Sequence, residues 1–125
     1  MPPYVLFVCR SCAFAKDQRE HLGQRGGFHL LTQLQQHYQT WEFSARFSIQ
    51  PVECLSACNR PCVVAYAAPC KTTLMFGDLP PLQSATAILQ LAEQYYASPD
   101  GIVTRQERPE GLKKGILARI SPLPE

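Results

Sequence analysis

Residues 4–8, Tyr4-Val5-Leu6-Phe7-Val8, form an unbroken apolar run that is too short for a helix and rich in β-forming side chains. Such a run is typical of a strand that is buried on both faces, as in a parallel sheet. Cys9 follows directly, so the sequence places this cysteine at the C-terminal end of the predicted strand. A parallel partner strand must then be reached through a crossover connection.

The next two segments have the patterns of a helix and a second strand. Apolar residues from Phe28 to Tyr38 recur at helical spacing, which predicts a helix over about 27–39. Residues 42–52 alternate in part between apolar and polar side chains, so we predict a strand there. Together with the first run, these segments form a β-α-β unit.

A hairpin and a second helix are predicted downstream. Residues 63–67 and 72–76 are two β-like runs joined by a short loop, as in a β-hairpin. Pro80-Pro81 favours the start of a helix, since proline is well tolerated in a first turn. Apolar residues from Leu82 to Tyr96 then share one helical face, and Pro99-Asp100-Gly101 ends the helix.

A parallel pair joined by a right-handed helical crossover, followed by an antiparallel pair and a second helix, is the thioredoxin-like arrangement. We therefore predict an α/β (α+β) fold with a four-stranded mixed sheet. The thioredoxin-like domain is expected over residues 1–101, and residues 102–125 are expected to form a C-terminal tail that packs on the domain or extends from it.

Composition is that of an ordinary globular domain. The chain has 125 residues, of which 46% are apolar, enough for a core that needs no disulfides. A net charge of +2 is too small for a nucleic-acid-binding face, and no apolar run is long enough to span a membrane. The first residues lack a cationic lead-in to a secretory signal, so we expect a cytoplasmic protein. In that reducing compartment, closely spaced cysteines more often bind metal or perform redox chemistry.

Four of the six cysteines form two short pairs. Cys9 and Cys12 follow the first predicted strand, and Cys54 and Cys58 follow the second. The C-terminal ends of parallel neighbouring strands meet at one edge of a sheet, so the fold is expected to bring both pairs together. The sequence therefore predicts a site of four thiolates.

The loop Cys54-Leu55-Ser56-Ala57-Cys58 after the second strand, with paired cysteines after the first, resembles the thioredoxin-like [2Fe–2S] ferredoxins. Further motifs, among them Phe76-Gly77-Asp78-Leu79, also resemble a family of small predicted metal-binding proteins assigned to that class. The resemblance implies a [2Fe–2S] cluster held by Cys9, Cys12, Cys54 and Cys58. It also implies an electron-transfer protein, not an enzyme, that exchanges single electrons with redox partner proteins, a reductase and an acceptor.

In one respect the chain departs from these ferredoxins. They often place the second ligand further along the first loop, where this chain has Leu22, so Cys62 is the alternative to Cys12 as fourth ligand. The preferred interpretation of Cys62 is a small buried hydrophobe, and of Cys70 an exposed thiol at a hairpin tip. Arg10 and Arg60, beside the proposed ligands, could offset the negative charge of a cluster.

Two other functions fit the cysteine pattern. Four cysteines with short spacings can bind zinc or cobalt, which would make the protein a metal-binding module. Alternatively, Cys9 and Cys12 form the C-x-x-C motif of a thioredoxin-type thiol-disulfide oxidoreductase. That interpretation leaves Cys54 and Cys58 without a role, and it requires a helix N-terminus at the motif. A homodimer is compatible with all three functions.

Overall fold

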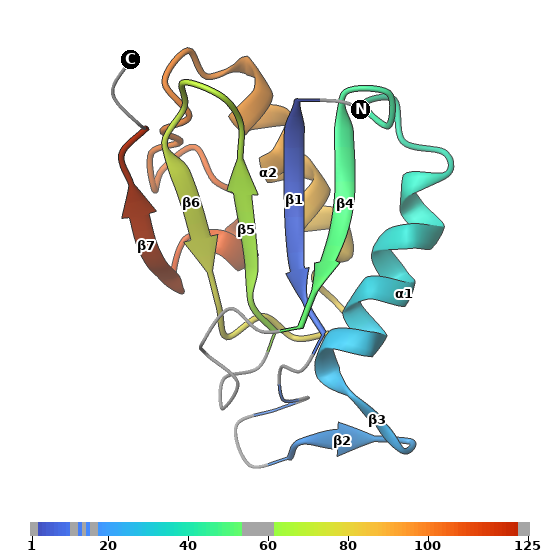
Figure 1. Ribbon diagram of the computed structural model, residues 1–125. Coiled ribbons are helices and arrows are strands. Elements are labelled where there is room, and N and C mark those ends of the chain that lie inside the picture. Colours follow the sequence, from blue (N-terminus) through green and yellow to red (C-terminus); the bar gives the residue numbers. More distant parts are fainter. Residues whose placement is uncertain (1–2, 11–12, 14, 16–17, 54–61, 123–125) are drawn as a thin grey trace.

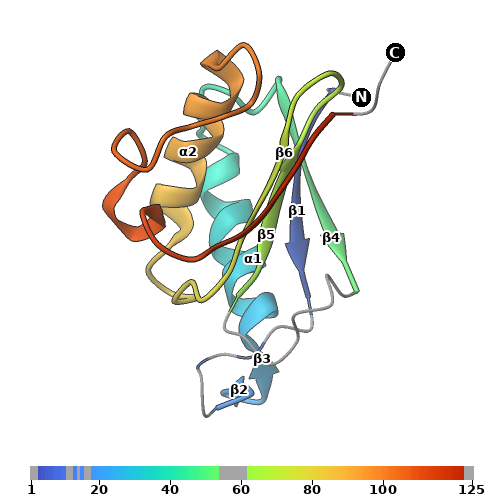
Figure 2. The same ribbon diagram turned by 90° about the vertical axis from the view of Figure 1, so that its left-hand side faces the viewer.

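The computed structural model describes residues 3–10, 13, 15, 18–53 and 62–122. A five-stranded mixed sheet with the strand order β4-β1-β5-β6-β7 forms one layer (Figure 1). The helices α1 (Gly26–Tyr38) and α2 (Ala85–Ala97) form the second layer, on one face of that sheet (Figure 2). The predicted thioredoxin-like fold class is confirmed, and the mixed sheet has five strands in place of the four predicted.

Strand β1 (Tyr4–Cys9) lies inside the sheet, between two neighbours of opposite direction. It pairs in parallel with β4 (Phe47–Val52), so that Tyr4 lies beside Phe47 and Cys9 beside Val52. On its other side it pairs antiparallel with β5 (Val64–Ala67). The apolar run therefore has a hydrogen-bonded strand on each side. The predicted burial on both faces is only partly correct, because both helices lie on one face and Val5 and Phe7 on the other face are half-buried.

The remaining strands extend the sheet beyond β5. Strand β6 (Thr73–Phe76) pairs antiparallel with β5, as expected for a hairpin. Strand β7 (Ile116–Ile120) then pairs antiparallel with β6, with a register shift at Met75/Phe76. This fifth strand comes from the C-terminal segment, where the sequence shows only a brief apolar patch. A short 3-10 helix, Glu110–Leu112, precedes it.

Two predicted elements begin later than their patterns indicate. Residues 42–46 form turns, and β4 starts only at Phe47, because the N–H groups of Arg46 and Phe47 donate to the carbonyl of Phe43. The second helix starts at Ala85 and not at Pro80, since residues 81–83 form a turn in which Gln83 N–H donates to the carbonyl of Pro80.

A small hairpin precedes α1 where the sequence shows only a polar segment. Its strands are β2 (Glu20–His21) and β3 (Gln24–Arg25), which pair antiparallel around a tip of Leu22 and Gly23. Both tip residues have positive φ angles, 54° and 80°. The hairpin projects beyond the edge of the sheet at which β1 and β4 end (Figure 1).

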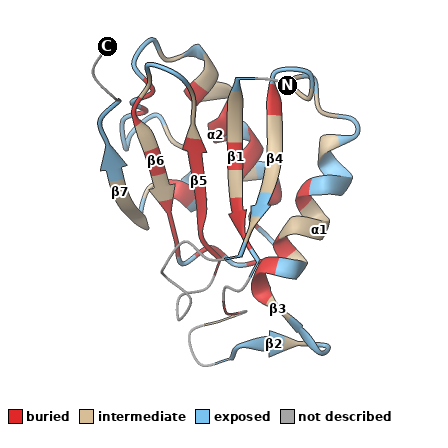
Figure 3. Ribbon diagram, in the orientation of Figure 1, coloured by how far each residue is buried: buried red, intermediate tan, exposed pale blue. Residues whose placement is uncertain are grey.

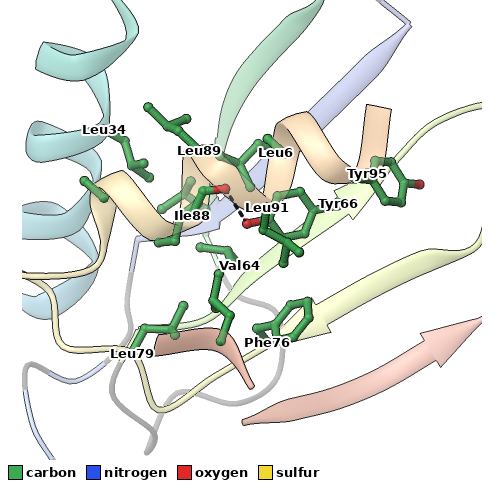
Figure 4. Packing of buried hydrophobic residues seen from close by; sticks show 14 of the residues in the cluster. Leu6, Leu34, Val64, Tyr66, Phe76, Leu79, Ile88, Leu89, Leu91 and Tyr95 are labelled. Carbon is green, nitrogen blue, oxygen red and sulfur yellow. Dashed lines mark hydrogen bonds between the residues drawn. The ribbon is translucent and has the colours of Figure 1, made fainter. Parts of the chain in front are cut away.

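The core lies between the sheet and the helices, and Figure 3 shows buried residues along the inner strands β1 and β5, on α2 and at the start of α1. Alternate residues of β1, Leu6 and Val8, join Leu34 of α1 and Ile88 of α2 in one cluster. Tyr66 of β5 is fully buried there, and its hydroxyl donates to the carbonyl of Ile88 at 2.8 Å (Figure 4). Across the described part of the chain, neither helix is long and apolar enough to cross a membrane.

The buried tyrosine makes stability dependent on alkaline pH. Burial raises the pKa of Tyr66 well above its ordinary value. The unfolded chain therefore releases this proton from about pH 10 upward, while the folded chain retains it, and the free energy of unfolding falls as pH rises.

We predict that Tyr66→Phe makes this alkaline loss of stability shallower by up to about 1.4 kcal/mol per pH unit. At neutral pH the same variant should cost about 1 kcal/mol, because the bond to Ile88 is lost. Urea unfolding between neutral and alkaline pH measures both effects, with Gln90→Ala on the exposed face of α2 as the control. An unchanged alkaline slope in Tyr66→Phe would contradict the prediction.

A candidate cysteine site at one edge of the sheet

The described cysteines of the site lie where β1 ends. Cys9 is the last residue of β1, and its N–H donates to the carbonyl of Val63 at 3.1 Å. The next residue, Arg10, donates its N–H to the carbonyl of Val52 at 2.9 Å. Cys62 precedes Val63, so Cys9 and Cys62 lie at the same edge. The predicted ligands Cys12, Cys54 and Cys58 are outside the described residues.

The register of β1 and β4 brings two distant parts of the chain together at this edge. Cys9 lies beside Val52. The described segment that contains β4 ends at Glu53, the residue before Cys54. Strand β4 therefore leads directly into the predicted ligand loop from a position next to Cys9. Of the predicted site, the described residues thus include Cys9 and, beside it, the end of β4.

Cys62 and Cys9 are both buried but belong to different apolar clusters. Cys62 lies in the main core on the helix side, whereas Cys9 packs with Val63 in a smaller cluster flanked by Met75 and Leu117. Burial, with a smaller contribution from nearby Cys9, raises the pKa of the Cys62 thiol to about 12. A thiol of that kind is neutral at physiological pH, which agrees with a role in the core.

The start of α1 packs directly on the backbone that follows β1. Gly26 and Gly27 are buried, and a β carbon at Gly27 would overlap the carbonyl oxygen of Cys9 and lie 2.7 Å from the carbonyl carbon of Arg10. A helix N-terminus carries roughly half a positive charge, and the first turn of α1, which is described throughout, has no acidic side chain. The region around Cys9 is thus favourable for negative charge.

The contact places a helix N-terminus at Cys9, which the sequence spacing alone did not indicate. Along the chain, α1 begins well after Cys9, which argued against a thioredoxin-type helix N-terminus at the cysteine pair. In space, the helix N-terminus lies against Cys9 and Arg10. In the sequence, the pair Gly26-Gly27 indicates only the start of a helix. It was the one feature that could have predicted the close approach of α1 to the backbone after β1.

Charged and imidazole side chains surround the edge. Arg10 forms an exposed ion pair with Glu53, with 3.1 Å between Nη1 and Oε1. The rings of His21 and His29 have centroids 5.5 Å apart and are tilted by 59° to each other, although their spacing in the sequence does not put them on one helical face. Among the described residues, no group of three or more His, Cys, Asp or Glu could hold a metal ion. The predicted ligands Cys12, Cys54 and Cys58 are not among the residues to which this statement applies.

The residues present are compatible with an iron–sulfur cluster. An oxidised [2Fe–2S] cluster with four thiolates is an anion, and the α1 N-terminus would stabilise negative charge next to Cys9. The described residues supply Cys9 directly and supply the β4 end from which Cys54 follows. The complete ligand set stays a prediction.

Comparison with solved structures identifies the fold as thioredoxin-like. The chain is similar to a thioredoxin-like [2Fe–2S] ferredoxin from Aquifex aeolicus, with a TM-score of 0.53 and 18% sequence identity, over 82% of this chain and 100% of that one. At this level of identity the likeness establishes a thioredoxin-like fold. Residues 6–122 match the family described as "Protein of unknown function (DUF1636)", so the chain belongs to that family. No curated protein matches the chain.

We predict that Gly27→Ala destabilises the protein by about 1–3 kcal/mol, although alanine is the better helix former. The new methyl group must displace α1 from the backbone of Cys9 and Arg10. Thermal and urea unfolding measure the change. Gly111→Ala is the matched control, since its nearest neighbour would lie 4.0 Å away. Equal stability of the two variants would show that α1 does not pack against this backbone.

We also predict that iodoacetamide alkylates Cys62 at least tenfold more slowly than Cys70 in the folded protein, because its thiol is buried and neutral. The difference should disappear in urea. Mass spectrometry of timed digests measures both rates. Rapid labelling of Cys62 under native conditions would place it outside the core.

Proposed function

We propose that this protein is a small [2Fe–2S] electron carrier, with the cluster at the edge of the sheet where β1 and β4 end. The observation that carries the proposal is the parallel pairing of these strands, which sets Cys9 beside the residues that lead into Cys54. The resemblance of the Cys54–Cys58 loop to thioredoxin-like ferredoxins, and the likeness in fold to one of them, support the choice of cluster.

The proposed ligands are Cys9, Cys12, Cys54 and Cys58. When bound, the cluster accepts and releases one electron at a time. The chain's own residues hold Cys9 in position through the bond to Val63, and Gly27 lets the positive end of α1 approach. Positive charge near the cluster stabilises its reduced, more negative form, so the α1 N-terminus would raise the reduction potential, whereas the charge of Arg10 is offset by its ion pair with Glu53. No bond in a substrate is made or broken.

A thiol-disulfide oxidoreductase is the second candidate, and one observation favours it. The N-terminus of α1 packs on Cys9 and Arg10, and a helix N-terminus lowers the pKa of a nearby thiol. In this function Cys9 and Cys12 would be the reactive pair, and the cysteines of the second loop would be idle. A zinc or cobalt module needs the same four thiolates as the cluster.

Purification without oxygen separates these functions. We predict a red-brown protein with about two irons and two sulfides per chain, whose visible absorption bleaches on reduction with dithionite. A colourless protein with zinc and no sulfide would support the metal-binding module. A colourless, metal-free protein that reduces disulfide substrates would support the oxidoreductase. Either result would contradict the proposal.

Serine substitutions then identify the ligands. Cys9→Ser, Cys54→Ser and Cys58→Ser should each lose most of the iron, while Cys70→Ser, at the exposed hairpin tip between β5 and β6, should retain it. Comparison of Cys12→Ser with Cys62→Ser decides the fourth ligand. We expect loss of the cluster in Cys12→Ser, and the opposite result would exchange the two residues.

A further inference from the structure

The hairpin formed by β2 and β3, which projects beyond the edge where β1 and β4 end, exposes a large apolar side chain at its tip. Leu22 at its tip is 85% exposed, more than any other large hydrophobic residue that the structure describes. Its φ angle of 54° lies in the left-handed region, which is unfavourable for a residue with a branched side chain. The two-residue loop of Leu22 and Gly23 requires positive φ at both positions, where asparagine or glycine would cost less than leucine.

The hairpin is fastened to its surroundings at both ends. His29 of α1 bonds through Nε2 to the carbonyl of His21, at 2.6 Å. Ala15 and Gln18 exchange two backbone hydrogen bonds, of 2.8 and 3.1 Å, and the side chain of Gln18 donates to the carbonyl of Glu20. These bonds hold the backbone of the hairpin in place, so little conformational entropy of that backbone is lost when a partner binds it.

A pocket of about 430 Å³ connects the hairpin to the cysteine edge. Gln24, Arg25 and Phe28 line it on the hairpin side, and Arg10 and Glu53 line it where β1 and β4 end. Phe28 is 46% exposed, so the pocket presents apolar surface as well, and β3, which follows Leu22 and Gly23 in the chain, connects the tip to it. Two arginines and one carboxylate give the lining residues a net positive charge.

We propose that Leu22, Phe28 and the arginine-rimmed pocket form the docking surface for the redox partner, a protein that presents apolar side chains flanked by carboxylates. The nature of the partner rests on the proposed function. The position fits because the pocket begins at Arg10, directly after Cys9, and electron transfer requires close approach to the cluster. A second copy of this chain fits less well, since a symmetric contact would bring the arginines of the two copies together.

Calorimetric titration with short synthetic peptides tests this surface. The first peptide carries leucine and phenylalanine flanked by glutamates, the second has lysines in place of the glutamates, and the third has serines in place of the apolar residues. We expect saturable binding of the first alone, weakened by added salt. Leu22→Asn should weaken it by about tenfold or more, because asparagine tolerates positive φ but removes the apolar contact.

Two further variants complete the design. Arg25→Gln should weaken binding and reduce its salt dependence, whereas Ile120→Thr, which changes a 56% exposed residue at the far end of β7, should leave it unchanged. Absence of saturable binding, equal binding of the lysine peptide, or full affinity in Leu22→Asn would overturn the proposal. So would self-association of the wild-type chain that Leu22→Asn abolishes, which would assign the surface to a second copy.

Iron and sulfide content, measured on the same samples, separates this inference from the proposed function. Failure of docking in a protein that carries its cluster overturns the docking surface alone. Peptide binding by a protein that never acquires a cluster overturns the electron-carrier function and leaves an acidic-peptide docking surface.

Discussion

The parallel pairing of β1 with β4 is the constraint on which the site depends. Because the two strands run in the same direction, the residues after both of them emerge at one edge of the sheet, and the register puts Cys9 beside Val52. An antiparallel arrangement would separate Cys9 from the Cys54 loop by the length of a strand. The helical crossover through α1 makes the parallel arrangement possible, and packing of Leu30 and Leu34 against the sheet keeps it in place.

The same crossover gives the edge its electrostatic character. Since Gly27 has no side chain, α1 begins in contact with the backbone after Cys9, and its positive end faces a region where thiolates or an anionic cluster would lie. Two buried tyrosines hold the other helix, α2, against the sheet, because the hydroxyl of Tyr66 donates to the carbonyl of Ile88 in α2 and the hydroxyl of Tyr95 in α2 donates to the carbonyl of Thr72. The sheet and the two helices therefore position the edge at which the predicted ligand loops begin.

Much of this architecture could be predicted from the sequence because local patterns and the topology rule agreed. The apolar run at 4–8 and the helical spacing over 27–39 predicted the bounds of β1 and α1 to within one residue. The strand at 116–120 could not be predicted with the same means, since its side chains are half buried or exposed and its pairing with β6 is a tertiary contact. The β2–β3 hairpin was missed because its strands have only two residues each, and the proximity of His21 to His29 follows from that hairpin. Of the predicted ligands, the described residues include Cys9 alone.

The most direct test of the central claim is a crystal structure of the protein purified without oxygen, with diffraction data collected at the iron absorption edge. We predict one anomalous peak, from iron, within bonding distance of the sulfur of Cys9 and of sulfurs of the loop that follows β4. No iron at the sheet edge where β1 and β4 end, or iron bound by cysteines of only one of the two loops, would contradict the claim that the parallel strand pair assembles the site.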